Sequence, residues 1–127
     1  MSAFAAPANT PGAYRANAVL TASHGQLIVM LYDGARRFLH QAGVAMSERQ
    51  IAAAHNKLSR AEGILRHLRA TLDMEQGQLP ERLQAIYTFS LNNLRQARLE
   101  QDPRKIEQVS DLLGRLRGAW AAVAEEA

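Results

Sequence analysis

The sequence predicts an all-α fold, an antiparallel up-down four-helix bundle with a flexible N-terminal arm. Apolar residues recur at intervals of three and four through four long segments, which is the period of amphipathic helices. Pro, Gly and Asp separate these segments, and no segment shows the alternation of apolar and polar residues that is typical of a strand. Helices of about 20 residues with short connections pack most simply as antiparallel neighbours. We divide the chain into an arm, residues 1–20, and a bundle, residues 21–127.

The arm begins with small residues and two prolines that show no apolar period, so it is predicted to be flexible. Tyr14 is the feature within it that allows two interpretations. It is either a surface residue or an anchor with which the arm covers an apolar groove.

The first helix is marked by the longest apolar run, Leu27–Tyr32. Ser23 and Gln26 have the spacing of a capping box at its start, and the pattern fades near Gly43. A helix that is apolar on most sides is surrounded on most sides. We therefore expect this helix to be the most enclosed one of the bundle.

The second helix is predicted to follow a second capping-box spacing, Ser47 with Gln50, and to carry an unbroken apolar seam from Ile51 to Leu72. That seam contains no acidic residue. Gly77 in the next connection allows a positive φ.

The third helix is predicted from about Pro80 to Leu99 and has an apolar arc about twice as wide as an amphipathic helix needs. Phe89 lies on one side of this arc, while Tyr87 and Leu91 lie on the other. Either the helix is enclosed on two sides or part of it lines an exposed groove.

The fourth helix is predicted to begin at Asp102-Pro103, with Asp as N-cap and Pro in the first helical position. Apolar residues then repeat at three and four as far as Val123, with Trp120 assigned to the core. This helix closes the bundle.

Composition excludes several classes of protein. The 127 residues suit one domain, 47% are hydrophobic and 21% charged, and there is no cysteine. No apolar run approaches the roughly 20 residues of a membrane span, and the N-terminus lacks the pattern of a signal peptide. The chain is therefore predicted to be cytoplasmic, without disulfides or membrane insertion.

Catalytic and metal-binding motifs are absent from the sequence. No Glu is followed by His three residues later, which excludes the di-iron sites of some bundles. The four histidines are scattered and have no metal-ligand spacing: His24, His40, His55 and His67. We predict no enzyme activity, no metal and no cofactor.

The isoelectric point of about 9.8 raises the alternative of a basic nucleic-acid-binding bundle. The formal net charge is only +3, and the arginines are spread in pairs along polar faces instead of forming one stripe. A solvated surface is the simpler interpretation, so we do not expect a nucleic acid as a partner. A further alternative is a bundle that only self-associates.

The residues themselves resemble a known family, the flagellin export chaperones called FliS. The likeness covers about residues 14–121 in a single register. Its most specific part is the run Met30-Leu31-Tyr32-Asp33-Gly34 after Thr21-Ala22-Ser23. It continues through Tyr14, Leu72-Asp73, Ile86-Tyr87, Gln96-Ala97, Ile106-Glu107-Gln108-Val109 and Ala119-Trp120.

The resemblance implies a cytoplasmic chaperone that binds the C-terminal segment of newly made flagellin and passes it to the flagellar export apparatus. Other flagellar regulators or export components are further expected partners. The chain itself is expected to be a monomer or a weak homodimer. In this family the N-terminal segment can lie over part of the binding surface, which favours Tyr14 as an arm anchor.

The predicted partner-binding residues are Tyr14, Ile64, Tyr87, Leu91, Asn92 and Arg95, with Asn92 and Arg95 as the polar rim. Leu31, Tyr32, Asp33 and Gly34 form the family signature. For Ile64, Tyr87 and Leu91 the competing interpretation is core packing, and Asp33 is open to a simpler role as the partner of a nearby arginine.

Overall fold

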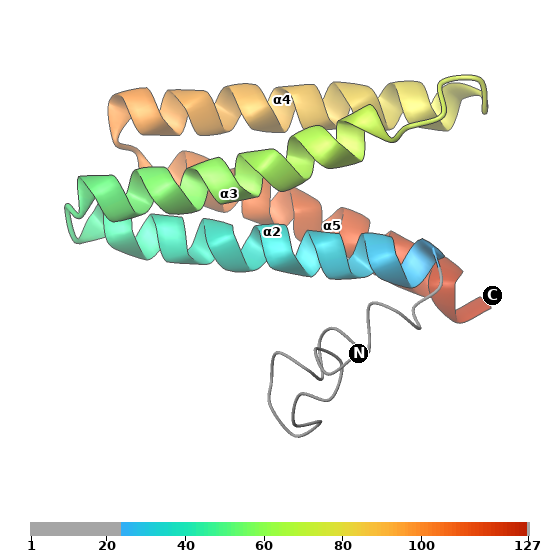
Figure 1. The fold of residues 1–127 in the computed structure, drawn as a ribbon, viewed down its shortest axis with the longest axis horizontal. Coiled ribbons are helices and arrows are strands. Elements are labelled where there is room, and N and C mark those ends of the chain that lie inside the picture. Colours follow the sequence, from blue (N-terminus) through green and yellow to red (C-terminus); the bar gives the residue numbers. More distant parts are fainter. Residues whose placement is uncertain (1–23, 127) are drawn as a thin grey trace, which may run out of the picture.

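The computed structural model describes residues 24–126, which form four helices (Figure 1). These are α2 (His24–Ser47), α3 (Ile51–Ala70), α4 (Gln78–Glu100) and α5 (Pro103–Glu126). The predicted arm, Tyr14 and the predicted cap at Ser23 lie outside the described residues.

The four helices form the predicted antiparallel bundle. α2 packs closely along both α3 and α5, whereas α4 lies between α3 and α5 and packs less closely on them (Figure 1). Helices that are diagonal to one another therefore meet mainly through side chains in the core. This arrangement makes α4 the helix with the least backbone packing.

A single hydrophobic core fills the middle of the bundle. The predicted seams supply it, because apolar residues spaced three and four apart face inward on every helix. The largest fully enclosed side chains are Tyr32 and Leu39 of α2, Leu58 and Leu65 of α3, Tyr87 and Leu94 of α4, and Val109 and Leu113 of α5.

The end of α2 differs from its prediction. The helix passes Gly43 and continues to Ser47, because Ala45 and Met46 are buried in the core. Arg49, with φ of 61°, then adopts the left-handed conformation that ends the helix. The N–H of Gln50 donates to the carbonyl of Ala45, and the N–H of Arg49 to that of Met46.

The second predicted capping box is therefore wrong. Ser47 belongs to the last turn of α2 and does not precede α3 as an N-cap. Gln50 occupies the N-cap position of α3, and its side chain makes no capping hydrogen bond.

The later helix ends follow their predictions more closely. α4 begins two residues before Pro80, after Gly77, whose φ of 92° is the positive value expected there. Asp102 accepts a hydrogen bond from the backbone N–H of Arg104 at 3.0 Å, so the predicted N-cap of α5 is confirmed.

The prediction that the first helix is enclosed on most sides is correct only for its second half. Tyr32, Ala35, Leu39 and Ala42 are fully buried, but the run Leu27–Met30 is only half-buried. Helix neighbours among the described residues leave one side of this first turn uncovered.

A buried ion pair joins α3 to the loosely packed α4. Arg98 donates two hydrogen bonds to the Glu62 carboxylate, at 2.6 and 3.1 Å, and a third, from its Nε, to His55 Nδ1 at 3.1 Å. The Glu62 side chain is only 6% exposed and that of Arg98 26%. This carboxylate beside the apolar seam was not expected from the sequence.

Removing one partner of this pair is expected to destabilise the bundle strongly. Arg98→Met leaves the Glu62 charge buried without its partner, which costs about 3 kcal/mol of unfolding free energy. Urea denaturation measures the loss. The matched control is the double variant Glu62→Gln with Arg98→Met, which is expected to regain most of the lost unfolding free energy. Equal stability of Arg98→Met and the unmodified chain would show that the ion pair does not stabilise the bundle.

Candidate functional site

An apolar pocket opens at the end of the bundle where α2 and α4 begin and where α3 and α5 end. We call it the end pocket, and its volume is about 420 Å³. Its apolar lining consists of Leu27, Ile28, Leu31, Leu68, Leu72, Leu79, Pro80, Leu83, Tyr87 and Trp120. Its polar lining consists of His24, His67, Thr71, Asp73 and Gln76.

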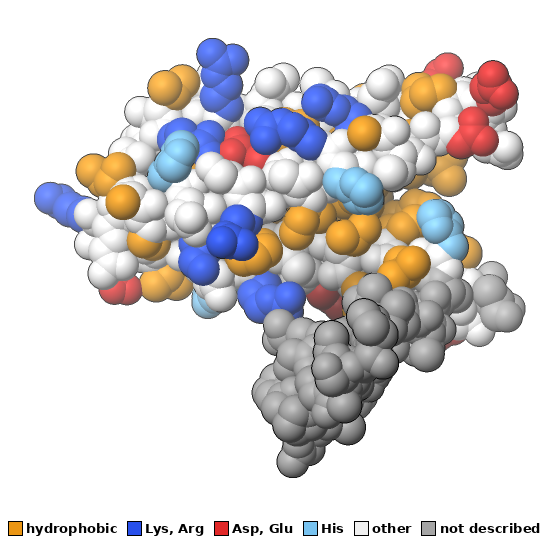
Figure 2. Space-filling model, in the orientation of Figure 1, with side chains coloured by type: hydrophobic (Ala, Val, Ile, Leu, Met, Phe, Trp, Pro, Cys, Tyr) orange, Lys and Arg blue, Asp and Glu red, His pale blue; other side chains and the backbone are white. Residues whose placement is uncertain are grey.

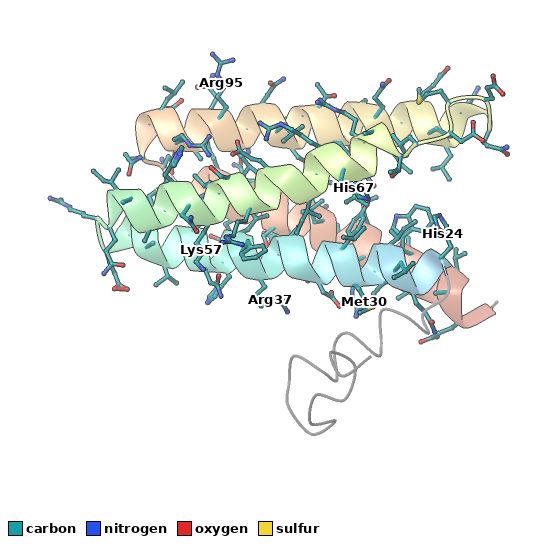
Figure 3. The ribbon with its side chains drawn as sticks, viewed as in Figure 1. His24, Met30, Arg37, Lys57, His67 and Arg95 are labelled. Carbon is teal, nitrogen blue, oxygen red and sulfur yellow. The ribbon has the colours of Figure 1, made fainter. Side chains whose placement is uncertain are left out.

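The mouth of the end pocket exposes apolar surface. Figure 2 shows hydrophobic side chains gathered between two histidines, which are His67 on α3 and His24 on α2 in Figure 3. Leu79, at the start of α4, is 60% exposed. Contiguous apolar surface of this kind marks binding sites, because its exposure to water is unfavourable.

Tyr87 lines the floor of the end pocket, and Tyr32 is its buried hydrogen-bond partner. The hydroxyls of Tyr32 and Tyr87 lie 2.6 Å apart and share a hydrogen bond across the bundle, from α2 to α4. Their rings meet edge to face, with centroids 6.4 Å apart. Burial raises the pKa of both hydroxyls, so the floor carries no charge near neutral pH.

The four signature residues, all on α2, contact either the end pocket or a neighbouring helix. Leu31 lines the end pocket, and Tyr32 is the buried partner of Tyr87. Asp33 accepts hydrogen bonds from Arg117 of α5 at 2.9 and 3.2 Å, so the predicted pairing with a nearby arginine is present. Gly34 is buried, and a Cβ there would lie 3.5 Å from Ile64 Cδ1.

The predicted partner-binding residues fall on both sides of α3. Ile64 is half-buried against α2, and Tyr87 belongs to the floor of the end pocket. Leu91, Asn92 and Arg95 instead line a second depression between α3 and α4, of about 490 Å³. We call it the arginine groove; its lining is Glu62, Arg66, Arg69, Leu91, Asn92, Arg95, Arg98 and Leu99.

Sequence reasoning missed most of the end pocket. Leu27 and Leu72 were assigned to apolar helix patterns, yet they remain partly exposed, and Leu79, just before the predicted third helix, is exposed. One usable signal was the apolar residues on both sides of the Gly77 turn. Their convergence with the start of α2 depends on contacts between distant segments.

Residues 24–126 show neither a cluster of three or more side chains suited to hold a metal ion nor a helix with the length and hydropathy needed to cross a membrane.

Comparisons with known proteins give the chain's family. Residues 7–127 match the family described as "Flagellar protein FliS". The chain belongs to the FliS family. A "Flagellar secretion chaperone FliS" from Salmonella typhimurium is 35% identical over 87% of this chain and 84% of the relative. Proteins of the same name from Escherichia coli and Bacillus subtilis are 34% and 30% identical, over 82% and 85% of this chain and 78% and 80% of the relatives.

Membership of FliS makes this chain a flagellar secretion chaperone and not an enzyme, as the resemblance and the missing catalytic motifs predicted. The nucleic-acid-binding alternative finds no support among these relatives.

The tyrosine pair at the floor is expected to contribute measurably to stability. Tyr87→Phe leaves the buried Tyr32 hydroxyl without this partner, at a cost of about 1 to 3 kcal/mol in unfolding free energy. Tyr32→Phe with Tyr87→Phe removes both hydroxyls and should cost less than the sum of the single variants. Denaturation of all four proteins completes a double-mutant cycle, and strictly additive losses would show that the hydroxyls are not coupled.

Stability is also expected to fall at alkaline pH through these two tyrosines. The folded state keeps both hydroxyls protonated, whereas those of the unfolded chain ionise near the ordinary value of 10.0. The pair's contribution is therefore complete below pH 10 and declines as pH rises above it, by up to about 1.4 kcal/mol per unit for each tyrosine. The free energy of unfolding, measured from pH 8 to 11, should decline less steeply with pH in the Tyr32→Phe, Tyr87→Phe double variant than in the unmodified chain. Parallel pH profiles of the two proteins would refute the contribution of the tyrosines.

Proposed function

We propose that this FliS-family chain is a cytoplasmic export chaperone for flagellin. It binds the C-terminal segment of newly made flagellin, prevents premature polymerisation and assists delivery to the flagellar type III export apparatus. The choice of client rests on the family resemblance, and the site rests on the end pocket. The open apolar surface of that pocket is the observation that carries the proposal.

The shape of the end pocket supports binding of an amphipathic helix. Its volume of about 420 Å³ accepts apolar anchor side chains, and Leu27, Ile28 and Leu31 supply an apolar wall on α2. Helix-in-groove recognition uses this combination, with anchors at helical spacing and the remainder of the helix lying along a neighbour. A segment that folds on binding needs such a surface to offset the free energy of ordering.

The charge of the end pocket supports a client held by apolar contacts. Among the described residues, its lining contains no Lys or Arg, and Asp73 is the one acidic residue. Complex formation should therefore depend little on salt, because burial of apolar surface does not involve counterion release. Covering this surface also removes the patch through which free chains would associate, which fits a monomer or weak homodimer.

Tyr14 remains a predicted contact. An arm that lays Tyr14 over the apolar surface would have to leave before the client binds, so the arm and the flagellin segment would compete. Regulators or export components that use the same surface would compete with the client as well.

Calorimetric titration with the C-terminal segment of flagellin from the same genome tests the proposal. We expect binding with a negative heat-capacity change and nearly equal affinity at low and high salt. Leu79→Glu places a charge at the exposed mouth of the end pocket and should weaken binding at least about tenfold.

The matched control is Ile51→Glu, at the opposite end of the bundle. Ile51 is 65% exposed, close to the 60% of Leu79, so the two changes place a charge at similarly accessible apolar sites. Equal weakening by both variants would reject the end pocket as the site. Absence of binding to the unmodified chain would reject flagellin as its client.

A further inference from the structure

The arginine groove is a strongly charged depression among the described residues. Four of the eight residues that line it are arginines, and one is glutamate. They leave three positive charges in the groove, which equals the formal net charge of the whole chain. Figure 2 shows side chains of the Lys and Arg type, in blue, gathered along the boundary of α3 and α4, with acidic red atoms between them.

Only part of this charge is satisfied within the bundle. The carboxylate of Glu62 is engaged by Arg98 through two hydrogen bonds, and Arg69 donates to the Thr88 hydroxyl at 3.3 Å. Within residues 24–126, neither Arg66 nor Arg95 has a hydrogen bond or an ion pair. Figure 3 shows Arg95 directed away from the bundle. Two guanidinium groups are therefore available to an anion.

The arginines stand at helical spacing on both walls of the groove. Arg66 and Arg69 are three residues apart on α3, as are Arg95 and Arg98 on α4, so each pair lies on one helix face. Leu91 and Leu99 lie on the same surface, and Leu99 is 70% exposed. The groove thus combines cations with apolar contact area.

We propose that the arginine groove is a second docking surface and binds an acidic peptide segment of a protein partner. The segment presents carboxylates to Arg66 and Arg95 and an apolar side chain to Leu91 and Leu99. Charge complementarity selects this occupant, since guanidinium groups bind carboxylates in a planar, two-pronged geometry. The site goes beyond the proposed flagellin site, because α3 separates it from the end pocket.

A nucleic-acid strand fits this groove less well than a peptide. Bases of single strands bind to proteins largely by stacking on aromatic side chains, and the described residues that line the groove include none. Its exposed apolar residues are leucines, which favour the side chains of another protein.

The probe is a fluorescein-labelled amphipathic peptide in which Glu and Leu repeat at helical spacing, titrated into the full chain and followed by fluorescence anisotropy. The groove variant is Arg66→Ala with Arg95→Ala. The control variant is Arg37→Ala with Arg115→Ala, two exposed arginines outside the groove, on α2 and α5. Both variants lose two positive charges, so general electrostatic attraction changes equally.

We expect the peptide to bind the unmodified chain and to bind the groove variant about tenfold more weakly, with little change for the control variant. A peptide with Gln in place of Glu should bind poorly. Equal loss in both double variants, equal binding of the Gln peptide, or no binding to the unmodified chain would each overturn the proposal. Stronger groove-dependent binding of an oligothymidine strand would overturn it in favour of nucleic acid.

Leu79→Glu separates this test from that of the proposed function. The substitution should weaken binding of the flagellin segment and leave the acidic peptide unaffected. Failure of the flagellin titration alone therefore leaves the arginine groove intact, and failure of the acidic peptide alone leaves the end pocket intact.

Discussion

The hydrogen bond between Tyr32 and Tyr87 is the buried polar contact on which the spacing of α2 and α4 depends. It links α2 to α4 across the core, although these two helices have little backbone contact. Each hydroxyl is buried, so each requires a partner to offset its lost hydration. The pair fixes the separation of α2 and α4 at one level: side chains fill the space on one side of it, and the end pocket opens on the other.

Polar contacts also hold the edges of α4, the least closely packed helix. On the α3 side, Arg98 engages Glu62; on the α5 side, Asn93 donates to the carbonyl of Lys105 at 3.0 Å. Such bonds require a particular geometry, whereas apolar contacts tolerate sliding. They therefore fix the register of α4 against its neighbours, and with it the position of Leu79 at the mouth of the end pocket.

The sequence predicts the fold of this chain better than its sites. Local periodicity identifies four helices and the middle of every seam, because these depend on residues three and four apart. The helix ends are harder, since Arg49 and Gln101 adopt the left-handed conformation that usually indicates Gly. The ion pair of Glu62 and Arg98 joins residues 36 positions apart, and no local pattern reports such a contact. The end pocket is missed for the same reason, as its walls come from all four helices.

The two proposed surfaces differ in the physics of their binding, and α3 keeps them apart. The end pocket is lined mainly by apolar residues, whereas the arginine groove is lined mainly by charged residues. Occupation of one therefore neither covers the other nor neutralises it. A helix that buries one face in the core and supports a different proposed surface on each flank would let a small bundle hold a client and contact a second protein at once. Salt would then weaken only the second contact, because ions screen charges but leave apolar burial intact.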